Sequence, residues 1–383
     1  MLIVELFVSI DWGVHRGLSS LFTKEVLLVT SFTQIGLVTS TFGLAKAVTN
    51  LGLGVLSDKI GRKPAIILGL ILSGLGGAMI ALSMTYNDML IGTALIGVGQ
   101  GSSFVGIMVS INEVVKSNRR GLAMGLFELI AYGGSSLGSA IGGYIAFAQG
   151  LRSPFFGIVI VSLVGAIVSF FTVTETREVK KTEEKSPSLD IHESYSTALK
   201  RSIPLYIAGF SSKIMDSLTV SFLPLYLAAL NMNIAEITAI TSAFTLSWAL
   251  SQPLTGYISD KLGRKKIVLI GLASTAVCVL PYTLTDNFIL MLVFSLVLGF
   301  SAALFYTPLI AIVGDISPPS LRGTLIGSYR FFRDMGYFAG PIILGIVADT
   351  YGILHSFYVT SLVLLITTAV VYVALRGTIT ANA

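Results

Sequence analysis

The chain has 383 residues, of which 54% are apolar and 12% charged, with a mean hydropathy of +0.84 and a net charge of +5. Soluble domains usually carry about 25% charged residues, so this composition excludes a disordered chain and weighs against a soluble enzyme. A membrane-spanning helix needs about 20 apolar residues, so twelve such helices with short loops account for the length.

In chain order, twelve apolar segments are each long enough to cross a membrane as a helix. They cover residues 2–22, 32–56, 65–85, 88–111, 121–147, 153–173, 202–227, 236–258, 267–285, 287–313, 323–347 and 352–375. A charged and polar stretch separates the sixth segment from the seventh. We therefore expect an all-α membrane protein with a six-helix bundle at 1–173, a cytoplasmic linker at 174–201 and a second six-helix bundle at 202–383.

Basic residues are distributed unevenly between the loops on the two sides of this arrangement. Eighteen of the 25 Lys and Arg residues fall on the side of the termini, and two, Lys24 and Arg152, fall on the opposite side. Cytoplasmic loops of membrane proteins carry an excess of Lys and Arg, so we expect a multi-pass protein of the cell membrane with both termini in the cytoplasm. The same distribution accounts for the positive net charge without a nucleic-acid partner.

The two halves carry similar phrases at a constant offset of 202 residues. Residues 54–64 read GVLSDKIGRKP, and residues 256–266 read GYISDKLGRKK. The same offset relates Gly138 to Gly340. Parallel repeats of this kind form a solute site at their interface, near the middle of the membrane. The offset therefore predicts two pseudo-symmetric halves with a central site.

The repeated phrase G-x-x-x-D-K-x-G-R-K, placed after the second and eighth segments, resembles the signature loop of the major facilitator superfamily. The resemblance covers essentially the whole chain. It implies the fold of that superfamily, a working monomer in the lipid bilayer, and transport of a small molecule. By the family pattern, Asp58 and Asp260 would each face the first turn of a helix in the opposite half, near Gly323 and Gly121, where the helix dipole favours an anion.

Such contacts would hold the cytoplasmic side shut and would break when it opens; in a simpler interpretation the loop only fixes topology. Two further phrases, in which an acid is followed after six residues by Arg-Gly, belong to the same region. The loop glycines are expected to permit close helix approach and sharp turns. The predicted gate residues are Gly54, Asp58, Gly61, Arg62, Glu113, Arg120, Asp260, Gly263, Arg264, Asp315 and Arg322.

Other phrases bear on the branch of the superfamily. The acid-x6-Arg-Gly arrangement and the TETR phrase at 174–177 resemble the sugar porters. Gly97 and Gly99 resemble a motif of the drug/proton antiporters, but that motif has an Arg where this chain has Thr93, and Ser139 stands where antiporters have Pro. Both departures weigh against a drug antiporter.

Ionisable residues at membrane depth are costly and mark functional sites. The helical rise of about 1.5 Å per residue places ten of them within the predicted spans. We expect them to form the solute and proton pathway: Asp11, His15, Arg16, Lys46, Glu128, Lys213, Asp216, Arg330, Arg333 and Asp334. Residues three or four apart share a helix face, which allows three internal pairs: Asp11 with His15, Lys213 with Asp216, and Arg330 with Asp334.

Four of these residues, Arg16, Lys46, Glu128 and Arg333, have no such partner and need one from another helix, from water or from the solute. With histidine taken as neutral, the basic side chains outnumber the acidic ones by one, which favours an anionic or carboxylate-bearing solute. Proton coupling needs a group that changes its charge during the cycle. We expect Asp11 with its neighbouring histidine as the first candidate and Glu128 as the second.

The sequence thus predicts a secondary active transporter that moves a sugar or organic-acid-like solute by alternating access, coupled to protons. One alternative is a proton-coupled multidrug or metabolite efflux pump, and another, from a different class, is a non-transporting membrane sensor. We do not expect an enzyme, because no nucleophile–base set is apparent. No P-loop phrase indicates a nucleotide cofactor, and the single Cys278 and three scattered histidines indicate no metal site.

Overall fold

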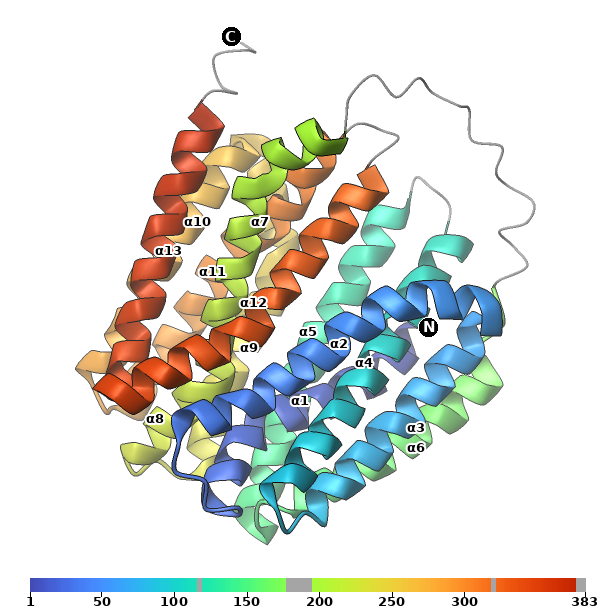
Figure 1. Cartoon of the computed structure of the whole chain (residues 1–383), viewed down its shortest axis with the longest axis vertical. Helices are drawn as coiled ribbons and strands as arrows, with labels where there is room; N and C mark the ends of the chain where they lie inside the picture. The colour runs from blue at the N-terminus through green and yellow to red at the C-terminus, as the bar shows by residue number, and fades with distance from the viewer. Residues whose placement is uncertain (116–118, 177–194, 318–321, 377–383) are drawn as a thin grey trace.

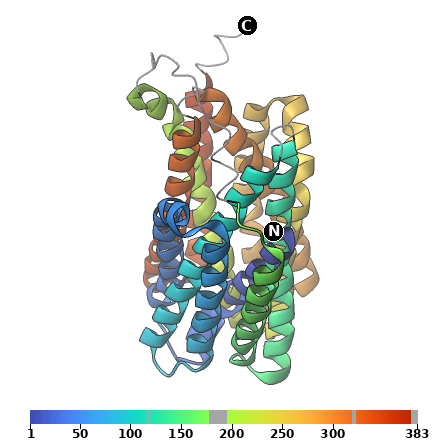
Figure 2. The ribbon, with the colours of Figure 1, turned by 90° about the vertical axis from the view of Figure 1, so that its right-hand side faces the viewer.

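The computed structural model describes residues 1–115, 119–176, 195–317 and 322–376, with side chains described throughout except at 51–60, 120–122, 195–198, 322–324 and 375–376. Over these residues the regular structure is entirely helical (Figure 1). A view turned by 90° shows that the long helices run in roughly the same direction (Figure 2). The all-α fold expected from the sequence is therefore confirmed.

Six long helices form the first half of the chain. They are α1 (Leu2–Glu25), α2 (Phe32–Ile60), α3 (Arg62–Ala81), α4 (Tyr86–Val114), α5 (Arg120–Gln149) and α6 (Ser153–Thr172). Several extend a few residues beyond the predicted apolar segments, because polar residues continue a helix past the hydrocarbon layer. Most of the predicted linker, 177–194, lies outside the described residues, so the division of the chain at 174–201 stays a prediction.

The second half repeats this plan with two interruptions. Its elements are α7 (Tyr195–Ser217), η3 (Leu218–Phe222), α8 (Leu223–Ala229), α9 (Ile234–Leu262), α10 (Arg264–Cys278), η4 (Leu280–Leu284), α11 (Phe288–Ile316), α12 (Arg322–Tyr351) and α13 (Ile353–Arg376). α7, η3 and α8 together make the seventh crossing, and α10 with η4 makes the ninth. Both interruptions lie next to a proline, which cannot donate a helical hydrogen bond.

The seventh crossing shows how such a break is stabilised. The helix passes from α7 into the π-helical turn η3 and then into α8. Pro224 has no N–H to donate to the carbonyl of Val220 one turn earlier. The hydroxyl of Ser20 on α1 donates to this carbonyl at 3.3 Å instead, which satisfies a buried polar group. The break thereby fastens α1 of one half to the seventh crossing of the other.

Eight of the described helices are long and apolar enough to cross a membrane. They are α3, α4, α6, α9, α10 with η4, α11, α12 and α13. The other four crossings carry ionisable side chains near their middle: Asp11 and Arg16 on α1, Lys46 on α2, Glu128 on α5, and Lys213 with Asp216 on α7. Charge therefore reaches the centre of the molecule from these four crossings and from α12, which carries Arg330, Arg333 and Asp334.

The two halves pack against each other along two seams, α2 with α12 and α5 with α9. A side-chain carbon added to Gly36 would lie 2.5 Å from the carbonyl oxygen of Pro341, and one on Gly43 would lie 3.0 Å from that of Tyr337. The absence of a side chain is what allows this approach. Figure 1 shows α2 and α12 side by side near one end and diverging toward the other. We call the end with these contacts the closed side, and the end where α2 meets α3 the open side.

On the open side, the facing helices of the two halves stand apart where the structure describes them. A side-chain carbon added to Gly125 on α5 or to Gly327 on α12 would meet no other atom within 4 Å. The carboxylates of Asp260 and Asp315 are 61% exposed. The halves are therefore joined on one side and separated on the other.

Candidate functional site

A cavity of about 240 Å³ lies between the two halves. Its walls come from α1, α2, α4 and α5 of the first half and from α7, α11 and α12 of the second. Apolar and aromatic side chains form most of the wall. Six charged residues stand among them, all of which belong to the pathway expected from the sequence: Lys46, Glu128, Lys213, Arg330, Arg333 and Asp334.

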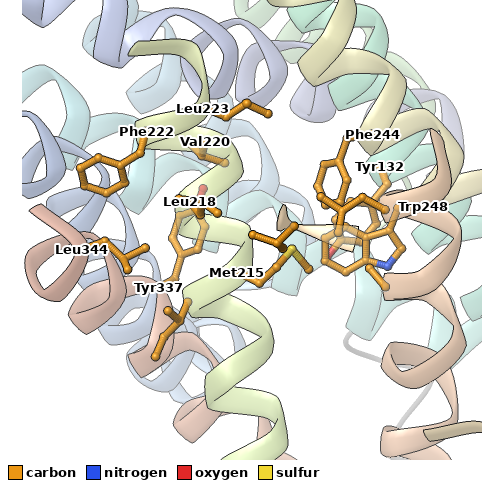
Figure 3. Close-up of a cluster of buried hydrophobic side chains, with 14 of the residues drawn as sticks. Tyr132, Met215, Leu218, Val220, Phe222, Leu223, Phe244, Trp248, Tyr337 and Leu344 are labelled. Atoms are coloured by element: carbon orange, nitrogen blue, oxygen red, sulfur yellow. The ribbon is translucent and has the colours of Figure 1, made fainter. Parts of the chain in front are cut away.

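Four aromatic side chains form one wall of the cavity and its backing; we call Trp12, Tyr132, Trp248 and Tyr306 the aromatic cluster. Trp12 meets Tyr132 edge-on with 5.7 Å between ring centroids, and Tyr132 stacks on Trp248 at 5.0 Å. Trp248 stands perpendicular to Tyr306 at 5.1 Å. Figure 3 shows Tyr132 and Trp248 with Phe244, on the flank opposite Phe222 and Leu344. Because these ring geometries are favourable, the cluster offers a preformed surface that joins both halves.

A buried ion cluster ties the halves together beside these rings. Arg16 of α1 pairs with Asp216 of α7, and Lys213 pairs with the same carboxylate at 2.7 Å. Asp216 is fully buried, while Arg16 and Lys213 are 6% and 5% exposed. The expected pair on α7 is therefore present, and Arg16 obtains its partner from another helix. One carboxylate shared by two buried cations leaves an excess of positive charge here.

The ion pairs on α12 differ from the expected pattern. Asp334 pairs with the adjacent Arg333 at 2.7 Å, not with Arg330. Arg333 also donates to the hydroxyl of Tyr306 at 2.8 Å. Arg330 instead faces Glu128 of α5, with 3.9 Å between nitrogen and oxygen. The expectation for Arg330 was wrong, because spacing along one helix identifies neighbours on that helix and says nothing of a carboxylate supplied by the opposite half.

Lys46 of α2 has a different environment from the other cavity cations. Its ammonium nitrogen lies 5.0 Å from the ring centroid of Trp12, 5.8 Å from that of Phe42 and 4.8 Å from that of Phe104. Among the described residues, no carboxylate forms an ion pair with it. Aromatic faces attract a cation but do not neutralise it. Lys46 therefore presents an unbalanced charge at the cavity wall.

Asp11 and His15, the expected proton-coupling pair, do not line the cavity. Asp11 accepts a hydrogen bond from Ser162 of α6, and its second oxygen has no partner among the described residues. The Nε2 atom of His15 lies 3.2 Å from the hydroxyl of Thr93, so the two expected partners each bond elsewhere. The structure places both inside the first half, between its own helices.

One buried acid escaped the sequence analysis. Glu5 is 1% exposed, and one of its oxygens accepts a hydrogen bond from Ser9 at 2.9 Å. Its other oxygen has no partner among the described residues. The sequence could have indicated this contact, because Glu5 and Ser9 are four residues apart at the start of an apolar helix and so share a face.

On the open side of the first half, the predicted gate residues form a network with the segment after α6. The carboxylate of Glu175 accepts hydrogen bonds from the first two N–H groups of α3, at 2.9 and 3.1 Å. Arg62 donates to Glu113 at 3.0 Å, and Thr176 donates to the other oxygen of Glu113 at 2.6 Å. Gly61 has a φ of 100°, which favours glycine. Glu175 and Thr176 of the TETR phrase thus bind the start of α3 and the end of α4, a role that the sequence did not reveal.

The second loop phrase forms a smaller network within its own half. Arg264 pairs with Asp260 at 2.9 Å and with Asp315 at 2.6 Å. Gly263 has a φ of 94°, so it makes the same sharp turn as its counterpart in the first half. Four predicted gate residues lie outside the described side chains: Gly54, Asp58, Arg120 and Arg322. The gate contacts across the halves therefore stay predictions.

On the closed side, an acid of the second half caps a helix of the first. Asp349 of α12 accepts hydrogen bonds from the N–H groups of Phe32 and Thr33, at 2.7 and 2.9 Å, and from the hydroxyl of Ser31 at 2.8 Å. The first N–H groups of a helix have no partner within it, and the helix dipole favours an anion there. This contact was also not predicted, because Ser31 and Asp349 lie 318 positions apart in the sequence.

Nearly the whole chain matches one protein family. A model of the Major Facilitator Superfamily matches residues 1–226 and again residues 205–381. The double match agrees with the internal repeat, and it confirms the resemblance that was read from the loop phrases.

Individual relatives span most of this chain. An uncharacterized MFS-type transporter, MJ1560, of Methanocaldococcus jannaschii is 27% identical over 330 residues, or 85% of this chain and 84% of that protein. Multidrug resistance protein MdtG of Dickeya zeae is 26% identical over 350 residues, or 89% of this chain and 84% of that protein. A solved bacterial homolog of the human lysosomal transporter Spinster, in an inward-facing and occupied conformation, aligns with a TM-score of 0.83 and 14% identity over 98% of this chain and 95% of that one. This last likeness is one of fold.

Proposed function

Since this chain belongs to the Major Facilitator Superfamily, we propose that it is a proton-coupled secondary transporter that exports small amphipathic organic molecules from the cytoplasm. The observation that carries the proposal is the cavity of about 240 Å³ between the halves, where aromatic rings and charged groups share one wall. Such a wall suits a molecule with an apolar body and a polar group. This is the efflux alternative of the sequence analysis, and relatives named as multidrug resistance proteins favour it.

The cavity wall also weighs against the sugar that the sequence analysis favoured. Sugar hydroxyls need many neutral donors and acceptors, since a polar group left unpaired on binding is costly. Among the described residues, the neutral polar groups of the wall are the amide of Asn50, the indole N–H of Trp12 and three tyrosine hydroxyls, and most of its charged groups already hold partners. A solute whose apolar part packs against the aromatic cluster needs fewer hydrogen bonds than a sugar does.

Alternating access follows from the asymmetry between the two sides. The closed side is held by close glycine contacts and by the cap from Asp349, each of which is small enough to be broken and remade. The cavity opens toward the side where the halves stand apart. Rocking of one half against the other, with the closed seam opening as the open side shuts, would move the solute across the membrane.

The loop charges support an orientation of the protein in the membrane. The open side carries the loop phrases at the α2–α3 and α9–α10 junctions, which include Lys59, Arg62, Lys261 and Arg264. The positive-inside rule assigns these loops to the cytoplasm. The described conformation is then inward-facing, with both termini in the cytoplasm, and it is the state in which an exporter would take up its solute.

We infer that Glu128 is the coupling group. Its side chain is 17% exposed, it lines the cavity, and it faces Arg330 of the opposite half. A proton from the solution reaches such a group without any rearrangement, and protonation removes its attraction for Arg330. Asp11 remains the alternative; it has an unpartnered oxygen, but a proton must pass between α1 and α6 to reach it.

The gate role of the loop acids is proposed for the outward-facing state. In the described conformation the carboxylate of Asp260 is exposed and pairs only with Arg264 among the described residues. When the cytoplasmic side closes, Asp260 would approach the first turn of α5, and Asp58 the first turn of α12. An anion at these helix starts is favoured by the dipole, which would stabilise the closed cytoplasmic side.

Proton movement in proteoliposomes tests this function. The purified chain would be reconstituted with a trapped pH dye and a clamped voltage, and ethidium, anilinonaphthalene sulfonate and glucose would be added separately. We expect a pH change with at least one amphipathic probe and none with glucose, relative to protein-free liposomes. A response to glucose alone would support the sugar transporter. Silence here and in radiolabelled counterflow would support the sensor.

A further inference from the structure

The charged groups at the centre of the molecule do not balance, and the positive excess lies at two places, Lys46 and the carboxylate that Arg16 shares with Lys213. Five basic side chains and three acidic ones meet there: Arg16, Lys46, Lys213, Arg330, Arg333, Glu128, Asp216 and Asp334. The three acids are taken up by Arg330, by Arg333, and jointly by Arg16 with Lys213. Asp11, which reduced the excess in the sequence count, lies outside the cavity wall. Among the described residues, Lys46 is left without an ion-pair partner; Asp334 and the buried Glu5 attract it from beyond ion-pair distance.

Aromatic rings also surround the ammonium group of Lys46. Three rings, those of Trp12, Phe42 and Phe104, lie with centroids 4.8 to 5.8 Å from its nitrogen. Rings exclude water, so an anion that reaches Lys46 interacts with it more strongly than with an exposed lysine. The same rings offer flat apolar surface directly beside the charge.

The second half supplies a similar arrangement opposite. The nitrogen of Lys213 lies 5.5 Å from the ring centroid of Trp248 and 5.4 Å from that of Tyr337. The guanidinium carbon of Arg16 lies 5.4 Å from the ring centroid of Trp12, so this ring contacts both Arg16 and Lys46. A bound organic cation would meet these like charges at close range. A bound acid would find the carboxylates of the wall, Glu128 and Asp334, already paired with Arg330 and Arg333.

The size of the cavity narrows the choice further. Pockets for drug-sized ligands usually measure about 300–1,000 Å³, and this cavity measures about 240 Å³. We propose that the transporter selects small aromatic acids of one or two rings, with the carboxylate bound by Lys46 and the ring against Trp12 and Tyr132. This inference rests on the function proposed above, and it makes Lys46 the residue that determines specificity.

The chain offers a built-in probe for a test. Its two tryptophans are Trp12 and Trp248, and both belong to the aromatic cluster, so intrinsic tryptophan fluorescence reports on this cavity alone. The full-length protein in detergent would be titrated with 3-phenylpropanoate, with its neutral amide 3-phenylpropanamide, and with the cationic 3-phenylpropylamine. Excitation at the red edge of tryptophan absorption avoids the probes. We expect a saturable change with the acid at a concentration about tenfold lower than with the amide or the amine.

Variants then assign the preference to one residue. Lys46→Gln should weaken binding of the acid by about 10- to 100-fold, the range for losing a hydrogen bond to a charged group, and should leave the amide unaffected. Lys46→Arg keeps the charge and should bind the acid within a few-fold of the parent protein. Lys24→Gln, a change at a surface lysine paired with Glu25 at 3.9 Å, is the matched control and should change nothing.

Three results would overturn the inference. They are an amine or amide that binds as tightly as the acid, a Lys46→Gln protein that binds the acid as the parent does, and no response to any probe. The ligand series on the parent protein decides the matter even if the variant fails to fold. A pH change on addition of ethidium in the proteoliposome assay would still support the transport function. Together with any of these three results, it would reject only the acid specificity.

Discussion

Arg16 and Asp216 lie 200 positions apart in the chain and form an ion pair across the two halves. Arg16 belongs to α1 and Asp216 to α7, and the pair is buried beside the aromatic cluster. Lys213 binds the second oxygen of the same carboxylate at 2.7 Å. In the proposed cycle α1 and α7 would move apart when the closed side opens, so this pair would be broken or rearranged in each turn of the cycle.

Removing the carboxylate should destabilise the protein strongly. Asp216→Asn leaves two buried cations without a counter-charge, which costs about 3–5 kcal/mol by comparison with other buried pairs. The thermal unfolding midpoint in detergent would fall accordingly. The double variant Arg16→Gln, Asp216→Asn restores the original charge excess and should recover part of the loss. Equal midpoints for the single and double variants would contradict this account.

Asp260→Asn is the control for that measurement. Its carboxylate is 61% exposed and pairs with Arg264 at 2.9 Å. Exposed ion pairs contribute about 0–1 kcal/mol, so the unfolding midpoint should hardly change.

The cap that Asp349 places on α2 should favour the inward-facing state. Asp349→Asn removes the charge but keeps an acceptor oxygen, and a charge at a helix end is worth about 0.3–1 kcal/mol. The ratio of outward- to inward-facing protein should rise about two- to fivefold. Replacing Cys278 by Ser and Thr39 by Cys gives a single thiol at a buried position of the closed seam, and its labelling rate should rise by that factor.

A second helix-capping acid, Asp88, serves as the control for the effect of Asp349→Asn on labelling. Asp88 accepts hydrogen bonds from the N–H groups of Thr85 and Met84, at 2.9 and 3.1 Å, within its own half. Asp88→Asn should therefore leave the labelling rate unchanged. If both acid variants raise labelling equally, the cause is a general loosening of the protein and not the cap.

Gly36 should tolerate no side chain. In Gly36→Ala the new carbon would lie 2.5 Å from the carbonyl oxygen of Pro341, and overpacking of this kind costs about 1–3 kcal/mol. We expect faster labelling of the same Thr39→Cys reporter and slower transport. Gly133→Ala is the control, because its new carbon meets no atom within 4 Å; unchanged behaviour of Gly36→Ala would show that α2 and α12 do not approach so closely.

Glu128→Gln should separate transport from coupling. Without a group that changes charge in the cavity, the variant should still exchange labelled solute in counterflow, but a proton gradient should no longer drive accumulation above the level of protein-free liposomes. Asp11→Asn should keep accumulation. The reverse pattern would place the coupling proton at Asp11, the first candidate of the sequence analysis.

Helix α1 shows both how far sequence reasoning reached and where it stopped. Residues four apart share a helix face. The spacing therefore places Asp11 and His15 on one face, and Trp12 and Arg16 on the adjacent face. The spacing does not determine which of the two faces points to the cavity. The structure turns Trp12 and Arg16 to the centre, with 5.4 Å between the guanidinium and the ring centroid, and turns Asp11 toward α6.

The apolar segments were enough to predict the twelve crossings, because hydropathy and helix length act locally along the chain. The family was expected from the resemblance of the two loop phrases to its signature loop. The partners of Arg16, Arg330 and Asp349 were decided only by tertiary structure. Each of them lies in the opposite half, and the sequence does not specify which helix faces which across an interface. The charge excess at Lys46 likewise emerged only once the other cations had been assigned to their acids.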